Sequence, residues 1–291
     1  MDARADIREF LTTRRARLTP KQAGLPAYGT RRRVAGLRRE EVAMLAGISV
    51  EYYTRLERGA TTGASEEVLD SVARALQLDE AERAHLFDLQ RAAGTTPTGR
   101  RRPAQERVRP AILAILDSMV GVPAYLRNGR LDILAANQLG RALYAPVLAD
   151  PTGTPNMARF IFLDTSAPDF FPHWDSAAND AVAILRAAAG HDPYDRRLSD
   201  LIGELSTRSD EFRVRWAAHN VKFHRTGTKD LHHPVVGDLH LAFEALELPD
   251  DSGQRILVYT AEPRSPSADA LNLLASWSTT TDEPAYSELE R

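Results

Sequence analysis

The chain has 291 residues, and its 37 Lys and Arg against 40 Asp and Glu give a formal net charge of −3. Because domains typically have about 100–200 residues, this length predicts two domains. The absence of cysteine excludes disulfides, catalytic thiolates and thiolate zinc sites. An isoelectric point near 6.3 argues against nucleic-acid binding by the chain as a whole. However, residues 1–109 carry a net charge of +6 and residues 110–291 a net charge of −9, so a basic first part precedes an acidic second part.

The distribution of charge also argues against export and membrane insertion. Asp2, Arg4 and Asp6 lie where a secretory signal needs an apolar core. The longest apolar run, residues 112–126, is interrupted by Asp117 and Pro123, and it is shorter than the about 20 residues of a membrane span. We therefore expect a cytoplasmic protein with no membrane partner.

The first part of the chain predicts five short helices. Apolar residues recur at helical spacing in five segments, which are separated by residues typical of helix ends. These segments are residues 6–18, 38–46, 49–58, 65–77 and 79–93. They predict one compact all-α domain over residues 1–93.

Residues 39–59 have the pattern of a helix-turn-helix. Two helices that cross tightly need a small residue at the crossing and a residue that tolerates a left-handed turn. Ala43 and Gly47 meet these needs, and the apolar Ile48 and Leu56 can hold the second helix against the first. A helical hairpin without a DNA-binding role is the alternative interpretation of the same spacing.

This stretch resembles the xenobiotic-response-element group of helix-turn-helix regulators, which have the lambda-repressor-like fold. The resemblance implies that residues 49–58 form the recognition helix. The side chains that would then face away from the core are Ser49, Val50, Glu51, Tyr52, Thr54 and Arg55. We expect these residues, with double-stranded DNA as the partner, to form the surface that contacts bases.

The residue types on this surface match the chemistry of base edges. Glu51 can accept a hydrogen bond from cytosine and Arg55 can bind guanine through two hydrogen bonds. Val50 or Thr54 can contact the methyl group of thymine. Arg38 and Arg39, which enter the preceding helix, are candidates for phosphate contacts.

A long connection, residues 19–37, separates the first two helices and contains Arg31, Arg32 and Arg33. An arginine triplet beside a recognition helix can reach phosphates or a narrow minor groove. A solvated charged loop is the alternative.

A linker rich in Gly, Pro, Thr and Arg follows over residues 94–109, so we place the second domain at residues 110–291. Asn128 and Gly129 predict a hairpin turn between the strands 123–127 and 131–135. Residues 110–119 and 137–220 indicate helices, residues 229–235, 239–246 and 255–261 indicate strands, and residues 266–276 a last helix. This order predicts an antiparallel α+β sheet with helices on one side, and it is also the order of a PAS-like domain.

Six short segments of the sequence carry a further resemblance to a known family. They are GLRREEVA (36–43), YYTRLE (52–57), NMARF (156–160), WAAHNV (216–221), HPVVG (233–237) and YTAEP (259–263). Together they resemble the MmyB-like transcription regulators over residues 6–276. The loop 60–64 departs from this pattern, because a more basic, proline-containing loop is expected there. The resemblance implies a helix-turn-helix regulator whose PAS-like domain binds a small, apolar effector such as a fatty acid.

Eight residues of the second domain are candidates for effector binding. The aromatic candidates for an apolar lining are Phe160, Phe162, Trp174 and Trp216, and the polar candidates for an acidic ligand are Arg127, Arg215, His219 and Asn220. Aromatic residues at helical spacing more often form ordinary core, and the arginines can instead form surface ion pairs.

Other functions have weaker support from the sequence. His232 and His233 are adjacent in a strand and point to opposite faces, so we expect no metal site. No hydrolase elbow, zinc-protease, Walker or dinucleotide motif is present, and we expect no enzyme and no tightly bound cofactor other than a possible fatty acid. We expect a homodimer on a two-fold operator. The alternatives are a second domain that only mediates protein interaction or dimerisation, and a hydrolase of an unfamiliar type.

Overall fold

The computed structural model describes residues 3–25, 34–61, 63–94, 108–149, 153–218, 226–249 and 253–281. The chain divides into two compact units, one with residues 1–103 and 182–223, and one with residues 104–181 and 224–291. Residues 182–223, which the sequence assigns to the second domain, therefore group with the N-terminal helices.

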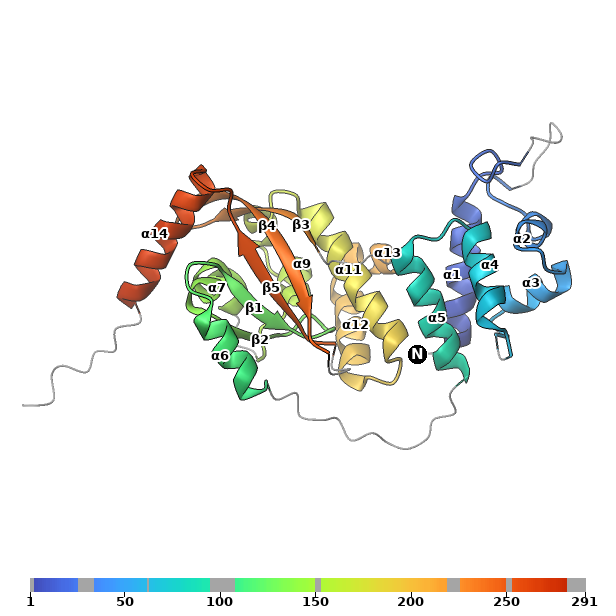
Figure 1. The fold of residues 1–291 in the computed structure, drawn as a ribbon, viewed down its shortest axis with the longest axis horizontal. Coiled ribbons are helices and arrows are strands. Elements are labelled where there is room, and N and C mark those ends of the chain that lie inside the picture. The colour runs from blue at the N-terminus through green and yellow to red at the C-terminus, as the bar shows by residue number, and fades with distance from the viewer. Residues whose placement is uncertain are drawn as a thin grey trace, which may run out of the picture. The chain divides into compact units, whose positions relative to one another are not determined.

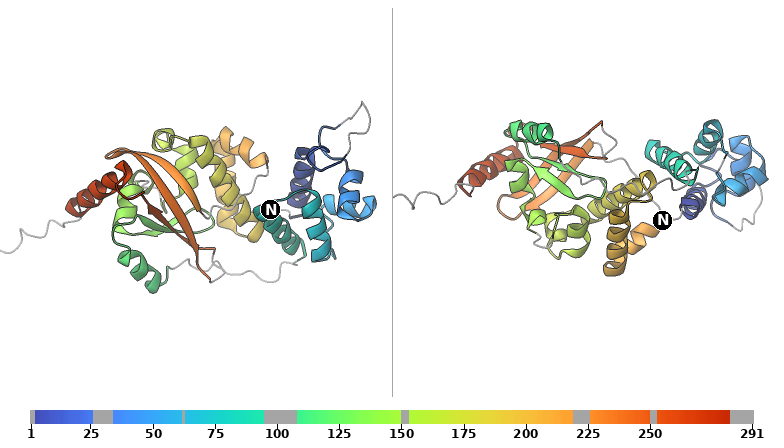
Figure 2. Two further views of the ribbon diagram at one scale, coloured as in Figure 1. Left: turned by 45° about the horizontal axis from the view of Figure 1, so that its top comes forward. Right: turned by 90° about the horizontal axis from the view of Figure 1, so that it is seen from below.

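Five helices form the N-terminal part of the first unit, as predicted (Figure 2). They are α1 (Ala3–Arg17), α2 (Arg39–Ala46), α3 (Val50–Glu57), α4 (Glu66–Ala75) and α5 (Glu80–Gly94). Ser49 and Ser65 cap α3 and α4, because each hydroxyl accepts a hydrogen bond from a backbone N–H of the first turn. The helices share one apolar core, which includes Ile7, Phe10, Leu11, Val42, Leu69, Val72 and Leu86.

The rest of the first unit comes from the end of α11 (Trp174–His191), from α12 (Arg196–Arg208) and from α13 (Asp210–Ala217). The Arg186 guanidinium lies 4.1 Å from the centre of the Trp216 ring and donates a hydrogen bond to the Trp216 carbonyl. Burial lowers the pKa of Arg186 to about 10. Within α13, the Phe212 ring stacks on the same Trp216 ring, with 5.5 Å between the ring centres. The contacts of Arg186 with Trp216 join α11 to α13.

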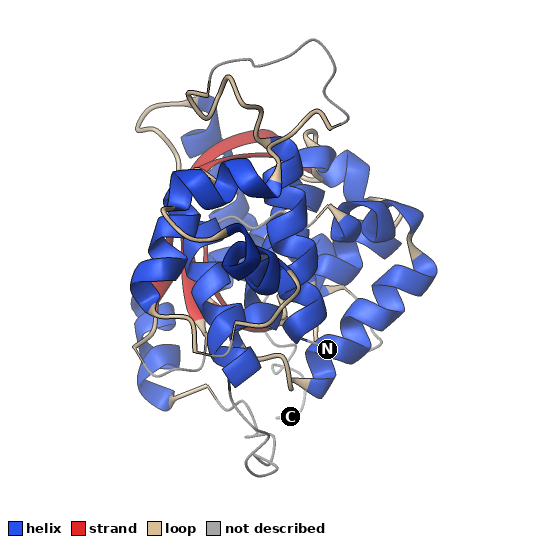
Figure 3. Cartoon of the chain, turned by 90° about the vertical axis from the view of Figure 1, so that its right-hand side faces the viewer, coloured by secondary structure: helices blue, strands red, loops and turns tan. Residues whose placement is uncertain are grey.

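The second unit contains a five-stranded antiparallel sheet, whose strands are red in Figure 3. Its strands are β1 (Ala124–Arg127), β2 (Ile133–Ala136), β3 (Thr226–His233), β4 (Gly237–Glu247) and β5 (Arg255–Thr260), in the order β2-β1-β5-β4-β3. The predicted order of two strands, a run of helices and three strands is confirmed. In β4 the predicted alternation also holds, since Leu239, Leu241 and Phe243 are buried and His240 and Glu244 are exposed.

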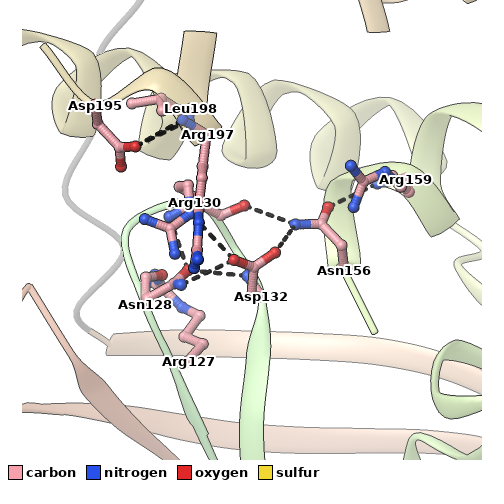
Figure 4. Close-up of polar contacts among 9 residues, drawn as sticks. All are labelled: Arg127, Asn128, Arg130, Asp132, Asn156, Arg159, Asp195, Arg197 and Leu198. Carbon is pink, nitrogen blue, oxygen red and sulfur yellow. Dashed lines mark hydrogen bonds and ion pairs between the residues drawn. The ribbon is translucent and has the colours of Figure 1, made fainter. Parts of the chain in front are cut away.

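The β1–β2 turn differs from the prediction in its boundary. The second strand begins at Ile133 rather than at Leu131, because Leu131 adopts a left-handed conformation with φ 67°. The Asn128 side chain closes the turn by accepting hydrogen bonds from the backbone N–H groups of Arg130, at 2.9 Å, and Asp132, at 3.0 Å (Figure 4). The pairing register between β1 and β2 consequently shifts after Leu126.

Helices cover both faces of the sheet, so the expectation of helices on one side is wrong (Figure 1). On one face, Ile112 and Leu116 of α6 (Pro110–Ser118) pack against Ala124, Leu126 and Ile256. Because neighbouring residues in a strand point to opposite faces, Tyr125 and Arg127 belong to the other face. The short helices between the strands are α7 (Gln138–Leu143), α8 (Ala145–Leu148), α9 (Met157–Leu163) and α10 (Ala167–Phe170). The last helix, α14 (Pro266–Thr281), packs against α7 and β4 and extends beyond its predicted end.

The buried side chain of Asn137 connects three segments of the second unit. Its Oδ1 atom accepts hydrogen bonds from the backbone N–H groups of Ala124, at 2.9 Å, and Gly140, at 2.7 Å. Its amide nitrogen donates to the carbonyl oxygens of Met119 and Val122, each at 2.8 Å. One amide therefore caps α7, holds the start of β1 and fixes the loop after α6.

Replacing Asn137 with Ala should lower the free energy of unfolding by about 2–4 kcal/mol, because two backbone donors and two carbonyls inside the fold lose their partner. Equilibrium urea unfolding followed by tryptophan fluorescence measures this loss. Asn272→Ala, at an exposed site on α14, is the matched control and should change stability by less than about 0.5 kcal/mol. Equal stabilities of the two variants would contradict the role of the Asn137 side chain.

Candidate functional site

The turn between α2 and α3 has the geometry that a helix-turn-helix requires. Gly47 ends α2 in the left-handed region, with φ 67°, where a side chain is disfavoured. The N–H of Ile48 donates to the carbonyl of Ala43 at 3.0 Å, which satisfies one of the last free carbonyls of α2. The Ser49 hydroxyl accepts the N–H of Tyr52 at 3.0 Å. The crossing of the two helices is therefore fixed by local hydrogen bonds.

Helix α3 divides into a buried and an exposed side. Tyr53, Leu56 and Glu57 are buried in the helical core. The six predicted base-contact residues lie on the other side: Ser49, Val50, Glu51 and Arg55 are exposed, and Tyr52 and Thr54 are partly exposed. The Arg55 guanidinium carbon lies 5.0 Å from the centre of the Tyr52 ring. The structure thus brings these six residues together on one surface.

Arg38 and Arg39 begin α2 and remain about half exposed. The backbone N–H of Arg38 donates to the Glu41 carboxylate at 2.7 Å, and its guanidinium pairs with Glu40 at 3.1 Å. The Nε atom of Arg39 donates to the Glu57 carboxylate. Both predicted phosphate-binding residues are therefore oriented by carboxylates of the same domain. Arg31, Arg32 and Arg33 lie outside the described residues.

The Glu57 carboxylate binds two arginines inside the helix-turn-helix, and the sequence did not predict this role. Its side chain is 1% exposed. Arg15 of α1 donates from Nε to Oε1 of Glu57 at 2.5 Å and from Nη1 to the Leu37 carbonyl at 2.9 Å. Arg39 binds the other carboxylate oxygen. Glu57 lies one helical turn after the inward-facing Tyr53, so its position on the buried face was the available signal.

The buried carboxylate affects its neighbour Tyr53. Burial and the negative charge of Glu57 raise the pKa of the Tyr53 hydroxyl above its usual value of 10. The phenol is therefore neutral at physiological pH and packs as part of the core. Two arginines and one neutral phenol surround the Glu57 carboxylate, which lets a charge sit inside a small helical domain.

Three of the aromatic effector candidates lie in the second unit. Phe160 is buried and packs against Phe170 and Phe171, with ring centres 5.8 and 6.1 Å away. Phe162 and Trp174 meet edge to face at 6.0 Å. The indole N–H of Trp174 donates to the Ile161 carbonyl at 2.9 Å, so this ring also holds the end of α9.

Arg127, the polar candidate on β1, is buried beside Tyr125 and Tyr259. Its side chain is fully enclosed and donates from Nη1 to the Asn128 carbonyl at 3.1 Å, whereas Nη2 has no partner in the described structure. Burial lowers the pKa of Arg127. The Tyr144 hydroxyl donates to the Tyr259 hydroxyl at 2.8 Å, and burial raises the pKa of both phenols well above 10.

The remaining candidates are not part of this unit or are not described. Arg215 and Trp216 belong to α13 in the first unit, and Arg215 pairs with Glu211 at 3.0 Å. His219 and Asn220 lie outside the described residues. The predicted effector residues are thus divided between the two units.

Two further properties concern only the described ranges. No group of three or more His, Asp or Glu residues within them is arranged to hold a metal ion. The helices that the structure describes include none that is long and apolar enough to cross a membrane.

Comparison with known protein families assigns both parts of the chain. The family model of the MmyB-like transcription regulator ligand binding domain matches residues 108–274. A helix-turn-helix domain model matches residues 8–86. No curated protein sequence matches the chain. The first match spans more than half of the chain, and the second includes α2 and α3 with the turn between them.

Replacing Glu57 with Gln should destabilise the helix-turn-helix by about 2–4 kcal/mol, because two arginines then face each other without the carboxylate that separates them. The partial exposure of Arg39 keeps the loss below that of a fully buried pair. Hydrogen exchange of residues 39–59 under increasing urea should show this loss directly. Glu67→Gln, an exposed change on α4, should leave the protection unchanged. Unchanged protection in the Glu57 variant would contradict the central role of its charge.

Proposed function

The chain belongs to the family of MmyB-like transcription regulators, and we propose that this ligand-responsive regulator senses a small apolar or fatty-acid-like effector in its C-terminal domain. The DNA-binding part of this function rests on α3. Its exposed side carries six residues on one surface, and the turn that precedes it is held by hydrogen bonds at the end of α2 and the start of α3. Transcription regulators of this kind couple effector binding to operator affinity.

On the DNA side, α3 enters the major groove with its exposed face toward the bases. Glu51 accepts a hydrogen bond from a cytosine amino group, and Arg55 donates two hydrogen bonds to a guanine. The stacking of Arg55 over Tyr52 supports this role, because it limits the conformations of the guanidinium. Arg38 and Arg39 bind phosphates at the start of α2, where the helix dipole also favours an anion.

We propose that two copies of the chain bind one operator. An eight-residue recognition helix reads only a few base pairs, so one copy alone gives limited discrimination among the many sites of a genome. A homodimer with two recognition helices reads two half-sites one helical turn apart. The acidic second part of the chain is repelled by phosphate, which suits it to effector binding and dimerisation rather than to DNA contact.

On the effector side, the proposal is supported by the match to a ligand-binding domain over residues 108–274 and by the aromatic residues that this domain contains. Phe160, Phe170 and Phe171 form a continuous cluster of edge-to-face rings. Tyr144 extends this cluster toward the sheet, with its ring centre 6.0 Å from that of Phe170. Bound effector shifts the chain between two states that differ in operator affinity.

Operator affinity should depend on an apolar acid. An operator selected from a random DNA pool with the purified full chain provides the target, and dodecanoic acid provides the probe. We expect the dissociation constant to change by about 5–150-fold when the acid is added, which is the usual range of allosteric coupling. Equal affinity with and without dodecanoic acid and related apolar probes would contradict the effector proposal and would favour a protein-interaction role for the second domain.

The arginine triplet should strengthen binding to all DNA sequences alike. Replacing Arg31, Arg32 and Arg33 together with Ala should weaken binding to operator and to random DNA, and should make the salt dependence shallower by up to about 2.7 in the slope of log K against log salt concentration. A control with the same change of charge replaces Arg196, Arg208 and Arg213, which are exposed on α12 and α13. An unchanged salt slope in the first variant would contradict the phosphate contacts.

A further inference from the structure

Helix α11 belongs to both units of the chain. Residues 174–181 lie in the second unit and residues 182–191 in the first, and the helix of 18 residues is continuous between them. The whole of α11 lies within the match to a ligand-binding domain, residues 108–274. The region that matches a ligand-binding domain therefore contributes part of the unit that contains the helix-turn-helix.

The end of α11 packs closely against α5 at Gly190. A Cβ atom on Gly190 would lie 2.6 Å from Nδ1 and 2.7 Å from Cε1 of His85, which is too close for non-bonded atoms. The His85 ring has little room to move, because it is 4% exposed and meets the Phe10 ring of α1 edge to face at 5.2 Å between ring centres. In this arrangement a residue larger than glycine does not fit at position 190.

The turn of α11 before Gly190 interacts with α1. The Arg186 side chain is buried, which lowers its pKa, and the negative charges of Asp6 and Glu9 on α1 act in the opposite direction. Helix α11 therefore meets α5 through Gly190 and is attracted to α1 through Arg186. We call the contact of Gly190 with His85, together with Arg186, the α11 seat.

The two helices that form the α11 seat also support the recognition helix. Phe10 of α1 and Leu86 of α5 share one core with Leu56 of α3. Arg15 of α1 donates to the Glu57 carboxylate at the end of α3 at 2.5 Å. Because such cores are close-packed, a displacement of α1 or α5 changes the position of α3.

The first half of α11 is held by contacts within the second unit. The indole N–H of Trp174 donates to the Ile161 carbonyl at 2.9 Å, and the Asp180 carboxylate lies 3.9 Å from Nζ of Lys229 on β3. A helix moves as a rigid element, so a shift of Trp174 or Asp180 is carried along α11 to Gly190. One helix thus joins contacts of the second unit to the support of α3.

We propose that α11 couples the two functions of the chain, and that the α11 seat sets the operator affinity of α3. This inference rests on the proposed effector-sensing function and adds its route of regulation. Effector binding moves α11, the seat changes between two arrangements, and α1 and α5 pass the change to α3. Gly190 and His85 are positioning residues, because both are buried and act through other side chains.

The test replaces Gly190 with Ala, which removes the close arrangement of the seat. Operator affinity of the full chain is measured by fluorescence anisotropy with and without dodecanoic acid. In Gly190→Ala the acid should change the dissociation constant by less than about twofold, because the two arrangements are no longer both accessible. Isothermal titration calorimetry should show an affinity for dodecanoic acid within about twofold of the original, a readout that general loss of structure would not preserve.

The matched control is Gly203→Ala on α12 of the same unit. Gly203 is exposed, and a Cβ atom there would have no neighbour within 4 Å. Both replacements remove a helical glycine and raise helix propensity alike. Gly203→Ala should therefore keep the operator affinity and the acid dependence of the original protein.

A double variant tests the contact itself. His85→Ala in the Gly190→Ala chain makes room for the new methyl group, so it should restore the acid dependence to within about threefold of the original, and His85→Ala alone completes the cycle. A double variant that stays insensitive to the acid would overturn the inference. If Gly190→Ala does not fold, the double variant should fold and show the dependence, and its failure to fold would likewise overturn the inference.

The outcomes separate this inference from the proposed function. If the acid changes operator affinity equally in the original protein and in Gly190→Ala, the coupling assignment is wrong and effector sensing stands. If the acid has no effect on the original protein, the effector proposal is wrong and operator affinity alone decides the inference. Gly190→Ala should then differ from Gly203→Ala by at least about fivefold, and equal affinities would overturn the role of the seat.

Discussion

The DNA-binding part of this protein depends on one buried carboxylate. Glu57 receives Arg15 from α1 on one oxygen and Arg39 from α2 on the other, and thereby fixes the end of α3 to both helices. A recognition surface requires that the position of α3 be set to within a fraction of an ångström, because base contacts are directional. Apolar packing alone is less directional than these charged hydrogen bonds. The exposed residues of α3 are therefore placed by a group on the buried side of the same helix.

The second unit contains the opposite arrangement of buried charge. Glu57 is neutralised by its own domain, whereas Arg127 on β1 is not. The amide of Asn137 accepts a hydrogen bond from Ala124 at the start of β1 and makes three more to Gly140, Met119 and Val122, so it ties this strand to α7 and to the loop after α6.

Local patterns in the sequence predicted the elements well and the polar interior poorly. The alternation of Leu239, Leu241 and Phe243 identified the buried face of β4, because strand periodicity is a local property. The left-handed Leu131 was not predicted, because positive φ is rare for residues other than glycine and the Asn-Gly pair indicates the turn without indicating where the second strand begins. Residues 182–223 likewise group with the N-terminal helices through tertiary packing, which no local pattern encodes.

The sequence by itself determined the helix-turn-helix, the order of strands and helices, and the family to which the chain belongs. These follow from spacing, from Gly47 and Ser49 at the ends of helices, and from the separation of basic and acidic parts. Only the tertiary structure decided which charges are paired. Arg15 and Glu57 are 42 residues apart, and their partnership arises only when α1 and α3 pack together. Arg14 and Arg127 are equally buried at 2% exposure, yet Arg14 pairs with Glu82 and Arg127 hydrogen-bonds to a backbone carbonyl, a difference that depends on the whole fold rather than on neighbours in the chain.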